Sequence, residues 1–159
     1  MTINETVLQK LAEWTAPREG RQTLAVPDQG SGWTVSLTAD RHDDLSCALW
    51  EMTLVRNTPA PAGDSLEKWA TRAAGRVSGL LETLKVYEID PQRNEALLRS
   101  SNPTRRGKNV YYYEVLLKGT TQALVRRYQT GKKQGKREQA GFALTHEQTA
   151  KFAADLAAD

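Results

Sequence analysis

Hydrophobic and polar positions follow two different periods along this chain. Residues 33–37 alternate strictly between apolar and polar side chains, which indicates a half-buried strand. Residues 47–56 are apolar at both odd and even positions, as expected for a central strand. Residues 64–84 instead repeat apolar side chains every three or four positions, so we predict a long amphipathic helix there. Asp64 is its expected N-cap, with Glu67 completing a capping box.

The remaining pattern predicts two further helices and several strands. One helix spans residues 4–14 and ends before Pro17, and another begins at Thr145, which forms a capping box with Gln148. Besides the two strands above, the expected strands are 24–26, 84–89, 95–100, 109–118, 121–129 and 140–144. These elements predict an α+β fold of order α-βββ-α-βββββ-α, in which helices pack on one face of antiparallel sheet. We expect one domain over residues 1–159, with sub-halves 1–83 and 84–159 as the alternative division.

Composition narrows the class of protein. The 159 residues are 39% hydrophobic and 26% charged, which is typical of a soluble globular protein and excludes a wholly disordered one. No apolar run approaches the roughly 20 residues of a membrane-spanning helix. The first residues lack the basic and apolar regions of a secretory signal, so we expect a cytoplasmic protein without membrane contact.

The net charge of +3 conceals an uneven distribution. Residues 91–137 contain 12 Lys or Arg and only two acidic residues, Glu95 and Glu114, whereas the segments before and after are net negative. A basic block of this kind attracts polyanions. The same residues also keep exposed hairpin loops soluble and protect strand edges, so charge alone leaves both interpretations open.

The hairpin formed by residues 109–118 and 121–129 is the first candidate for function. If Gly119 and Thr120 form a two-residue turn, Lys118 pairs with Thr121. The further cross-strand pairs are then Val115–Leu124, Tyr113–Arg126 and Tyr111–Tyr128. One sheet face would combine tyrosines with an arginine, although a slip of one residue exchanges the two faces.

Aromatic rings beside cations suit a single strand of nucleic acid, because bases stack on the rings and Lys or Arg neutralise phosphates. The candidate nucleic-acid-binding residues are Arg105, Arg106, Lys108, Tyr111, Tyr113, Arg126, Tyr128, Lys132, Lys133, Lys136 and Arg137. Ordinary packing is the alternative, since cross-strand Tyr–Arg pairs stabilise sheets without any ligand.

The same region resembles a known family. A hairpin ends in Arg126-Arg127-Tyr128, a Gly/Lys loop follows at 131–137, a short strand spans 141–144, and a helix opens with Thr145-His146-Glu147-Gln148. Residues 109–157 are thereby similar to the single-stranded-DNA-binding region of the positive-cofactor-four coactivators, which are structural relatives of the Whirly proteins. This resemblance implies a curved sheet that binds single strands in dimers or larger assemblies. It also implies that the residues near nucleic acid are Arg126, Tyr128, Lys133, Lys136 and Arg137.

No motif in the chain indicates an enzyme or a metal site. One Cys and two His are too few for a Cys/His zinc site of the usual composition. His42 lies among Asp40, Asp43 and Asp44, a pattern that suggests metal binding or acid–base chemistry, but a single His with carboxylates in a turn is usually solvated, and we expect that here. We expect His146 to be exposed in the first turn of the last helix and Cys47 to be a small core residue. Residues 131–137 are not a phosphate-binding P-loop, because the glycine spacing is one residue short. We therefore predict no catalytic residue, no metal and no cofactor.

Two function classes follow from these observations. The first is a non-catalytic module that binds single-stranded nucleic acid through residues 105–137. The second is a protein-interaction or secretion-chaperone-like module, an analogy based on the small α-βββ-α layout. The expected partners are accordingly a single-stranded nucleic acid or an acidic protein, with a homodimer as one form of assembly.

Overall fold

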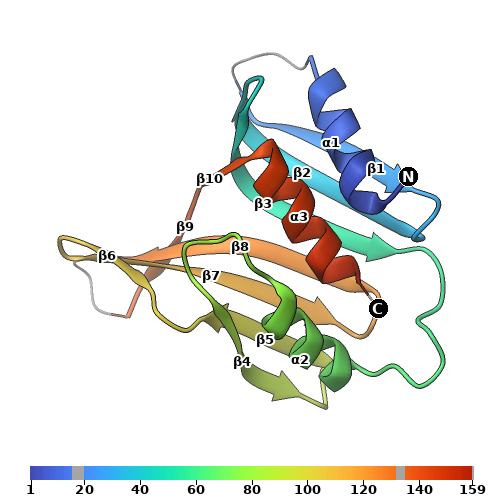
Figure 1. Ribbon diagram of the computed structural model, residues 1–159. Helices are drawn as coiled ribbons and strands as arrows, with labels where there is room; N and C mark the ends of the chain where they lie inside the picture. Colours follow the sequence, from blue (N-terminus) through green and yellow to red (C-terminus); the bar gives the residue numbers. More distant parts are fainter. Residues whose placement is uncertain (16–19, 132–134, 159) are drawn as a thin grey trace.

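The computed structural model describes residues 1–15, 20–131 and 135–158, which form three helices and ten strands (Figure 1). The helices are α1 (Ile3–Glu13), α2 (Leu66–Arg76) and α3 (His146–Ala157). The strands are β1 (Gln22–Asp28), β2 (Trp33–His42), β3 (Ser46–Arg56), β4 (Leu84–Asp90), β5 (Glu95–Ser100), β6 (Thr104–Arg106), β7 (Asn109–Lys118), β8 (Gln122–Thr130), β9 (Arg137–Ala140) and β10 (Phe142–Thr145). This order confirms the predicted α+β class, with β6 and β9 as short strands that the pattern did not predict.

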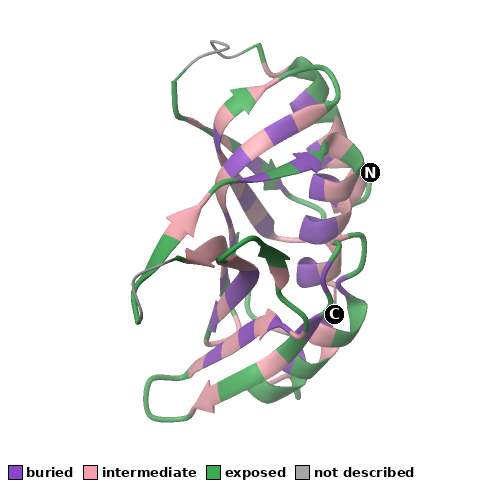
Figure 2. Ribbon diagram, turned by 90° about the vertical axis from the view of Figure 1, so that its left-hand side faces the viewer, coloured by how far each residue is buried: buried purple, intermediate pink, exposed green. Residues whose placement is uncertain are grey.

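The ten strands belong to one antiparallel sheet. Its main order is β1-β2-β3-β8-β7-β5-β4, and three short strands extend it, because β10 pairs with β3, β6 with β7, and β9 with β8. All three helices cover the same side of the sheet (Figure 2). We call that side the helix face and the other side, on which no described helix lies, the open face.

The core lies between the helices and the helix face. Alternation along β2 buries Trp33, Val35 and Leu37, as the sequence predicts. Other side chains of the same apolar cluster come from all three helices and the central strands, and include Val7, Leu11, Leu49, Leu54, Trp69, Leu98, Val115, Val125, Phe152 and Leu156. No described helix is long and apolar enough to cross a membrane.

Local signals fix the helix starts better than the helix ends. The capping box of Thr145 and Gln148 forms as predicted. The cap of α2 is Ser65 rather than Asp64, because the Ser65 hydroxyl accepts the hydrogen bond from the Lys68 amide. The helix ends at Arg76 instead of continuing to residue 84. Gly79 has a φ of +93°, which an α-helix does not accommodate, and β4 then begins within the predicted helix.

The β7–β8 hairpin has a different register from the predicted one. Lys118 pairs with Gln122 rather than Thr121, so the connection contains three residues instead of two. The backbone carbonyl of Thr121 accepts a hydrogen bond of 2.7 Å from the amide of Arg56, at the end of β3. Thr121 therefore lies in the turn and bonds to β3, and the slip of one residue relative to the prediction exchanges the two faces.

Candidate functional site

Four strand ends meet at one side of the molecule and form what we call the basic arm: β6, the first half of β7, the second half of β8, and β9. Arg105 pairs with Val110, Val110 with Thr130, and Thr130 with Arg137, so the four strands are consecutive neighbours. Figure 1 shows these strand ends extending beyond the helices. Basic residues about 30 positions apart in the sequence are thereby brought to one place.

The tip of the basic arm carries four exposed cations, which are Arg105, Arg106, Lys108 and Lys136. Within the described parts of the chain none of these four forms an ion pair with a carboxylate. The predicted site residues Lys132 and Lys133 lie outside the described residues. The tip therefore presents positive charge that the fold itself does not neutralise.

Tyr111 and Tyr113 lie on the helix face of the arm, which contradicts the predicted cluster. Tyr113 is 7% exposed, meets the ring of Phe142 edge to face, and has a raised pKa because its hydroxyl is buried. It is part of the core. Tyr111 is half-buried, with the guanidinium groups of Arg106 and Arg127 at 5.8 and 5.7 Å from its ring centre. Of the two tyrosines, only Tyr111 is partly accessible beside the exposed tip.

Arg126, Tyr128 and Arg137 lie on the open face, so the predicted single surface is divided between the two faces. The Arg137 guanidinium stacks 3.9 Å from the ring centre of Tyr128 and also bonds Glu114. The Nε of Arg126 lies 3.0 Å from a carboxylate oxygen of Glu51. These two arginines differ from the tip cations because each already has an acidic partner.

The centre of this open-face cluster consists of residues that the sequence did not indicate. The true register places Tyr112 beside Tyr128, with 6.1 Å between ring centres. Arg99 stacks 3.9 Å from the ring centre of the exposed Tyr87 and also bonds Glu114, which is 4% exposed. The available signal was Glu114, one of only two acidic residues in the basic block. An acidic residue within a basic block indicates that arginines of the block have a partner inside the fold.

A buried ion pair anchors the arm to the segment that follows α2. One oxygen of Glu82 accepts hydrogen bonds of 2.8 Å from Arg127 and 2.7 Å from the hydroxyl of Thr104. Both charged side chains are largely buried, at 2% exposure for Glu82 and 13% for Arg127. The arm is therefore held against the body of the protein rather than projecting as an independent hairpin.

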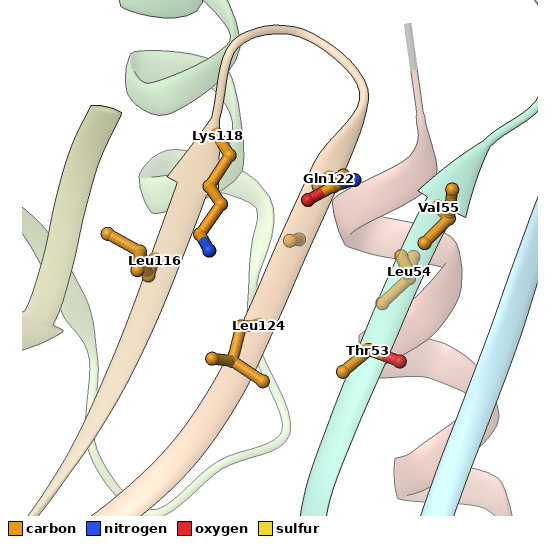
Figure 3. Close-up of a pocket in the computed structure, with 8 residues that line it drawn as sticks. Thr53, Leu54, Val55, Leu116, Lys118, Gln122 and Leu124 are labelled. Carbon is orange, nitrogen blue, oxygen red and sulfur yellow. The ribbon is translucent and has the colours of Figure 1, made fainter. Parts of the chain in front are cut away.

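The open face also contains a shallow hollow of about 220 Å³ between β3, β8 and β7 (Figure 3). Its walls include the apolar side chains of Val55, Leu116 and Leu124, with Lys118 and Gln122 at one end. Val55, at the rim of the hollow, is 39% exposed. No described helix or strand covers this hollow.

The two histidines and the cysteine differ from expectation in one respect. Cys47 is buried as predicted, and burial raises the pKa of its thiol to about 12. His42 and His146 are half-buried rather than solvated, and their rings stack on each other with centres 5.0 Å apart. Burial, with a further contribution from His146, lowers the pKa of His42.

Comparisons with known proteins do not extend this description. No family model, curated protein or solved structure matches the chain. The resemblance of residues 109–157 to the positive-cofactor-four family remains a prediction, and the assignment of function depends on the geometry described above.

Proposed function

We propose that the protein is a non-catalytic binding module that contacts single-stranded nucleic acid through its basic arm. The observation that carries the proposal is the group of exposed cations at the tip that pair with no carboxylate among the described residues: Arg105, Arg106, Lys108 and Lys136. Cations in such a group displace condensed counterions from phosphates, which supplies most of the affinity of sequence-independent binding.

Aromatic residues next to the tip favour a single strand over a duplex. Tyr111 lies within the arm on the helix face, and Tyr128 lies on the open face beneath the guanidinium of Arg137. A base stacks on a ring or on a guanidinium plane only when it has left the duplex stack. The side chain of Arg137 is 43% exposed, so its outer plane is accessible for this contact.

The test is a salt titration of binding to a fluorescently labelled single-stranded oligonucleotide, followed by anisotropy. We expect log affinity to fall linearly with log salt, with a slope of about −0.7 for each phosphate contact. The triple variant Arg105→Ala, Arg106→Ala, Lys108→Ala should make the slope shallower by about two units if all three residues contact phosphates.

A matched control removes the same charge elsewhere, through Lys10→Ala, Lys85→Ala and Arg93→Ala. All three are exposed and lie outside the arm. If binding depended only on net charge, both triple variants would lose the same affinity. Absence of binding at low salt, or equal effects of the two triple variants, would overturn the proposal.

The hollow on the open face favours a second candidate, a protein-interaction module. An apolar depression beside Lys118 suits an apolar side chain on an extended, acidic segment of another protein. If this candidate is correct, a protein partner co-purifies at a fixed stoichiometry and remains bound after nuclease treatment. The Leu124→Asp variant no longer binds that partner. A second copy of the chain is a further outcome, which light scattering during size-exclusion chromatography detects as a dimer.

A further inference from the structure

Three side chains with metal-binding atoms meet near the start of β3, away from the second half of β3 that pairs with β8. His42 ends β2, Cys47 lies at the start of β3, and His146 is the first residue of α3. One ligand atom from each of the three lies within 4.8 Å of the other two. Figure 1 shows that the β2–β3 turn, the start of α3 and the end of α1 come together in this region.

The strand pairing explains why these residues converge. His42 is the direct cross-strand partner of Cys47 in the β2–β3 hairpin. Cys47 is in turn paired with Leu144 of β10 on its other side, two residues before His146. The amide of His146 also donates a hydrogen bond of 2.9 Å to the carbonyl of Leu45. The backbone positions of all three residues are therefore fixed by these contacts.

Both histidines have a buried nitrogen without a hydrogen-bond partner. The Nε2 atoms of His42 and His146 are inaccessible to solvent and meet no donor or acceptor among the described residues. The His42 ring also lies close to the backbone of Leu11, on α1. A metal-ligating histidine commonly holds a backbone carbonyl with its second ring nitrogen, and Leu11 is the backbone group available for that role. Two such nitrogens in one cluster, beside a thiol at metal-ligand spacing, are the atoms that a bound cation would satisfy.

We propose that His42, Cys47 and His146 bind one Zn²⁺ ion through the two Nε2 atoms and the Sγ atom. A thiolate with two imidazoles is a donor set that zinc accepts in tetrahedral geometry, whereas magnesium and calcium prefer oxygen ligands. This site lies outside the basic arm and does not depend on the proposed function.

To hold the ion, the two histidine rings have to turn relative to each other, because they stack with only 5° between their planes and both Nε2 lone pairs must point at one ion. Zinc bond lengths of about 2.0 to 2.3 Å place tetrahedral ligand atoms roughly 3.3 to 3.6 Å apart. Separations of up to 4.8 Å therefore have to shorten by up to about 1.2 to 1.5 Å, through rotation of the side chains. The Trp14 ring also packs against the His42 ring, with 4.6 Å between ring centres. With three protein ligands, one tetrahedral position would be left for water.

Asp43 assists without being a ligand. Its Oδ1 accepts hydrogen bonds of 2.8 Å from the amides of both Leu45 and Ser46, which shape the β2–β3 turn. The remaining negative charge next to the three ligands increases the attraction for a cation.

The test uses the full chain without a histidine tag, since a tag would bind zinc itself. The protein is treated with a chelator, dialysed and titrated with Zn²⁺ in competition with a chromogenic chelator. We expect one ion per chain and a rise in the unfolding temperature with zinc concentration. Co²⁺ serves as the spectroscopic probe, because thiolate coordination produces a charge-transfer band that imidazole or carboxylate coordination does not.

Two ligand variants and one matched control make the result decisive. Cys47→Ser should abolish the cobalt–thiolate band, and His146→Ala should weaken zinc binding at least about 100-fold, since even residues that only orient ligands cost 10–100-fold. Glu147→Gln, the next and exposed residue of α3, should bind zinc like the unmodified chain. Circular dichroism confirms that each variant is folded.

Three results would overturn the proposal: no 1:1 binding, no thiolate band with Co²⁺, or unchanged zinc affinity in a folded His146→Ala variant. If Cys47→Ser fails to fold, His146→Ala and the cobalt spectrum of the unmodified chain still decide the question.

Discussion

The buried ion pair between Glu82 and Arg127 provides the strongest single test of the fold. Glu82 lies in the connection between α2 and β4, and Arg127 lies in β8, so the pair joins two segments 45 residues apart. Arg127 also packs 4.2 Å from the ring centre of Tyr113. Replacing Glu82 by Ala removes the carboxylate and leaves the arginine charge in a largely buried position.

The magnitude follows from the distance and the burial. At 2.8 Å and an effective dielectric constant of about 20, the attraction between the two charges is roughly 6 kcal/mol. Part of this attraction only compensates for the cost of removing both ions from water. The loss of one partner should cost about 3–5 kcal/mol, because the remaining charge stays buried without a partner. Since a domain is stabilised by only about 5–15 kcal/mol, the Glu82→Ala variant should be marginally stable.

The assay is urea denaturation followed by tryptophan fluorescence. A second variant, Glu82→Leu with Arg127→Met, removes both charges and should be less destabilised than Glu82→Leu alone, because no buried charge is left without a partner. Glu88→Ala, at an exposed position of β4, is the control and should change the free energy of unfolding by less than about 0.5 kcal/mol. A loss below about 1 kcal/mol in Glu82→Ala would refute the reasoning, since it would mean that water or another group already solvates Arg127.

Three further predictions concern single residues. Hydrogen bonding to Arg72 lowers the pKa of Asp64. This pair therefore stabilises the fold above the ordinary carboxyl pKa, and its contribution disappears as the pH falls through the lowered value. Asp64→Asn should be destabilised near pH 7 but not in strong acid, as measured by unfolding at a series of pH values. The thiol of Cys47, with a pKa of about 12, should react with a maleimide far more slowly in the metal-free native chain than in urea, since its thiolate fraction at pH 7 is on the order of 10⁻⁵. Gly32 has a φ of +78° and its added Cβ would collide with the side chain of Thr58, so Gly32→Ala should lower stability by about 1–3 kcal/mol in thermal unfolding.

Local patterns in the sequence were sufficient for most of the fold. Strict alternation identified the buried face of β2, and the Thr145–Gln148 capping box located the start of α3. They failed where tertiary contacts override local preference. Apolar spacing extended α2 to residue 84, but Leu81 is 97% exposed and Glu82 is buried in its ion pair, which is the reverse of the helical prediction.

The candidate site depended on a register that periodicity does not determine. Val115, Leu116 and Leu117 are consecutive apolar residues, so either face of β7 can serve as the core face. The observed register places Thr121 in the turn, where its carbonyl bonds to the amide of Arg56, on a strand more than 60 residues away in sequence. The prediction therefore identified the basic hairpin correctly but assigned Tyr113 and Arg126 to the same face, which is wrong.

The proposed zinc site likewise depends on a long-range contact that the local sequence does not reveal. In a β2–β3 hairpin, His42 and Cys47 lie near each other because they stand on either side of the polar turn. Nothing local places His146 there, since it lies 99 residues after Cys47 and reaches the site only where β10 pairs with the first half of β3. That position is available because β8 pairs only with the second half of β3, from Met52 onward. The three ligands come together because β3 pairs with β10 along its first half and with β8 along its second half. Counting the Cys and His residues of the sequence cannot detect this arrangement.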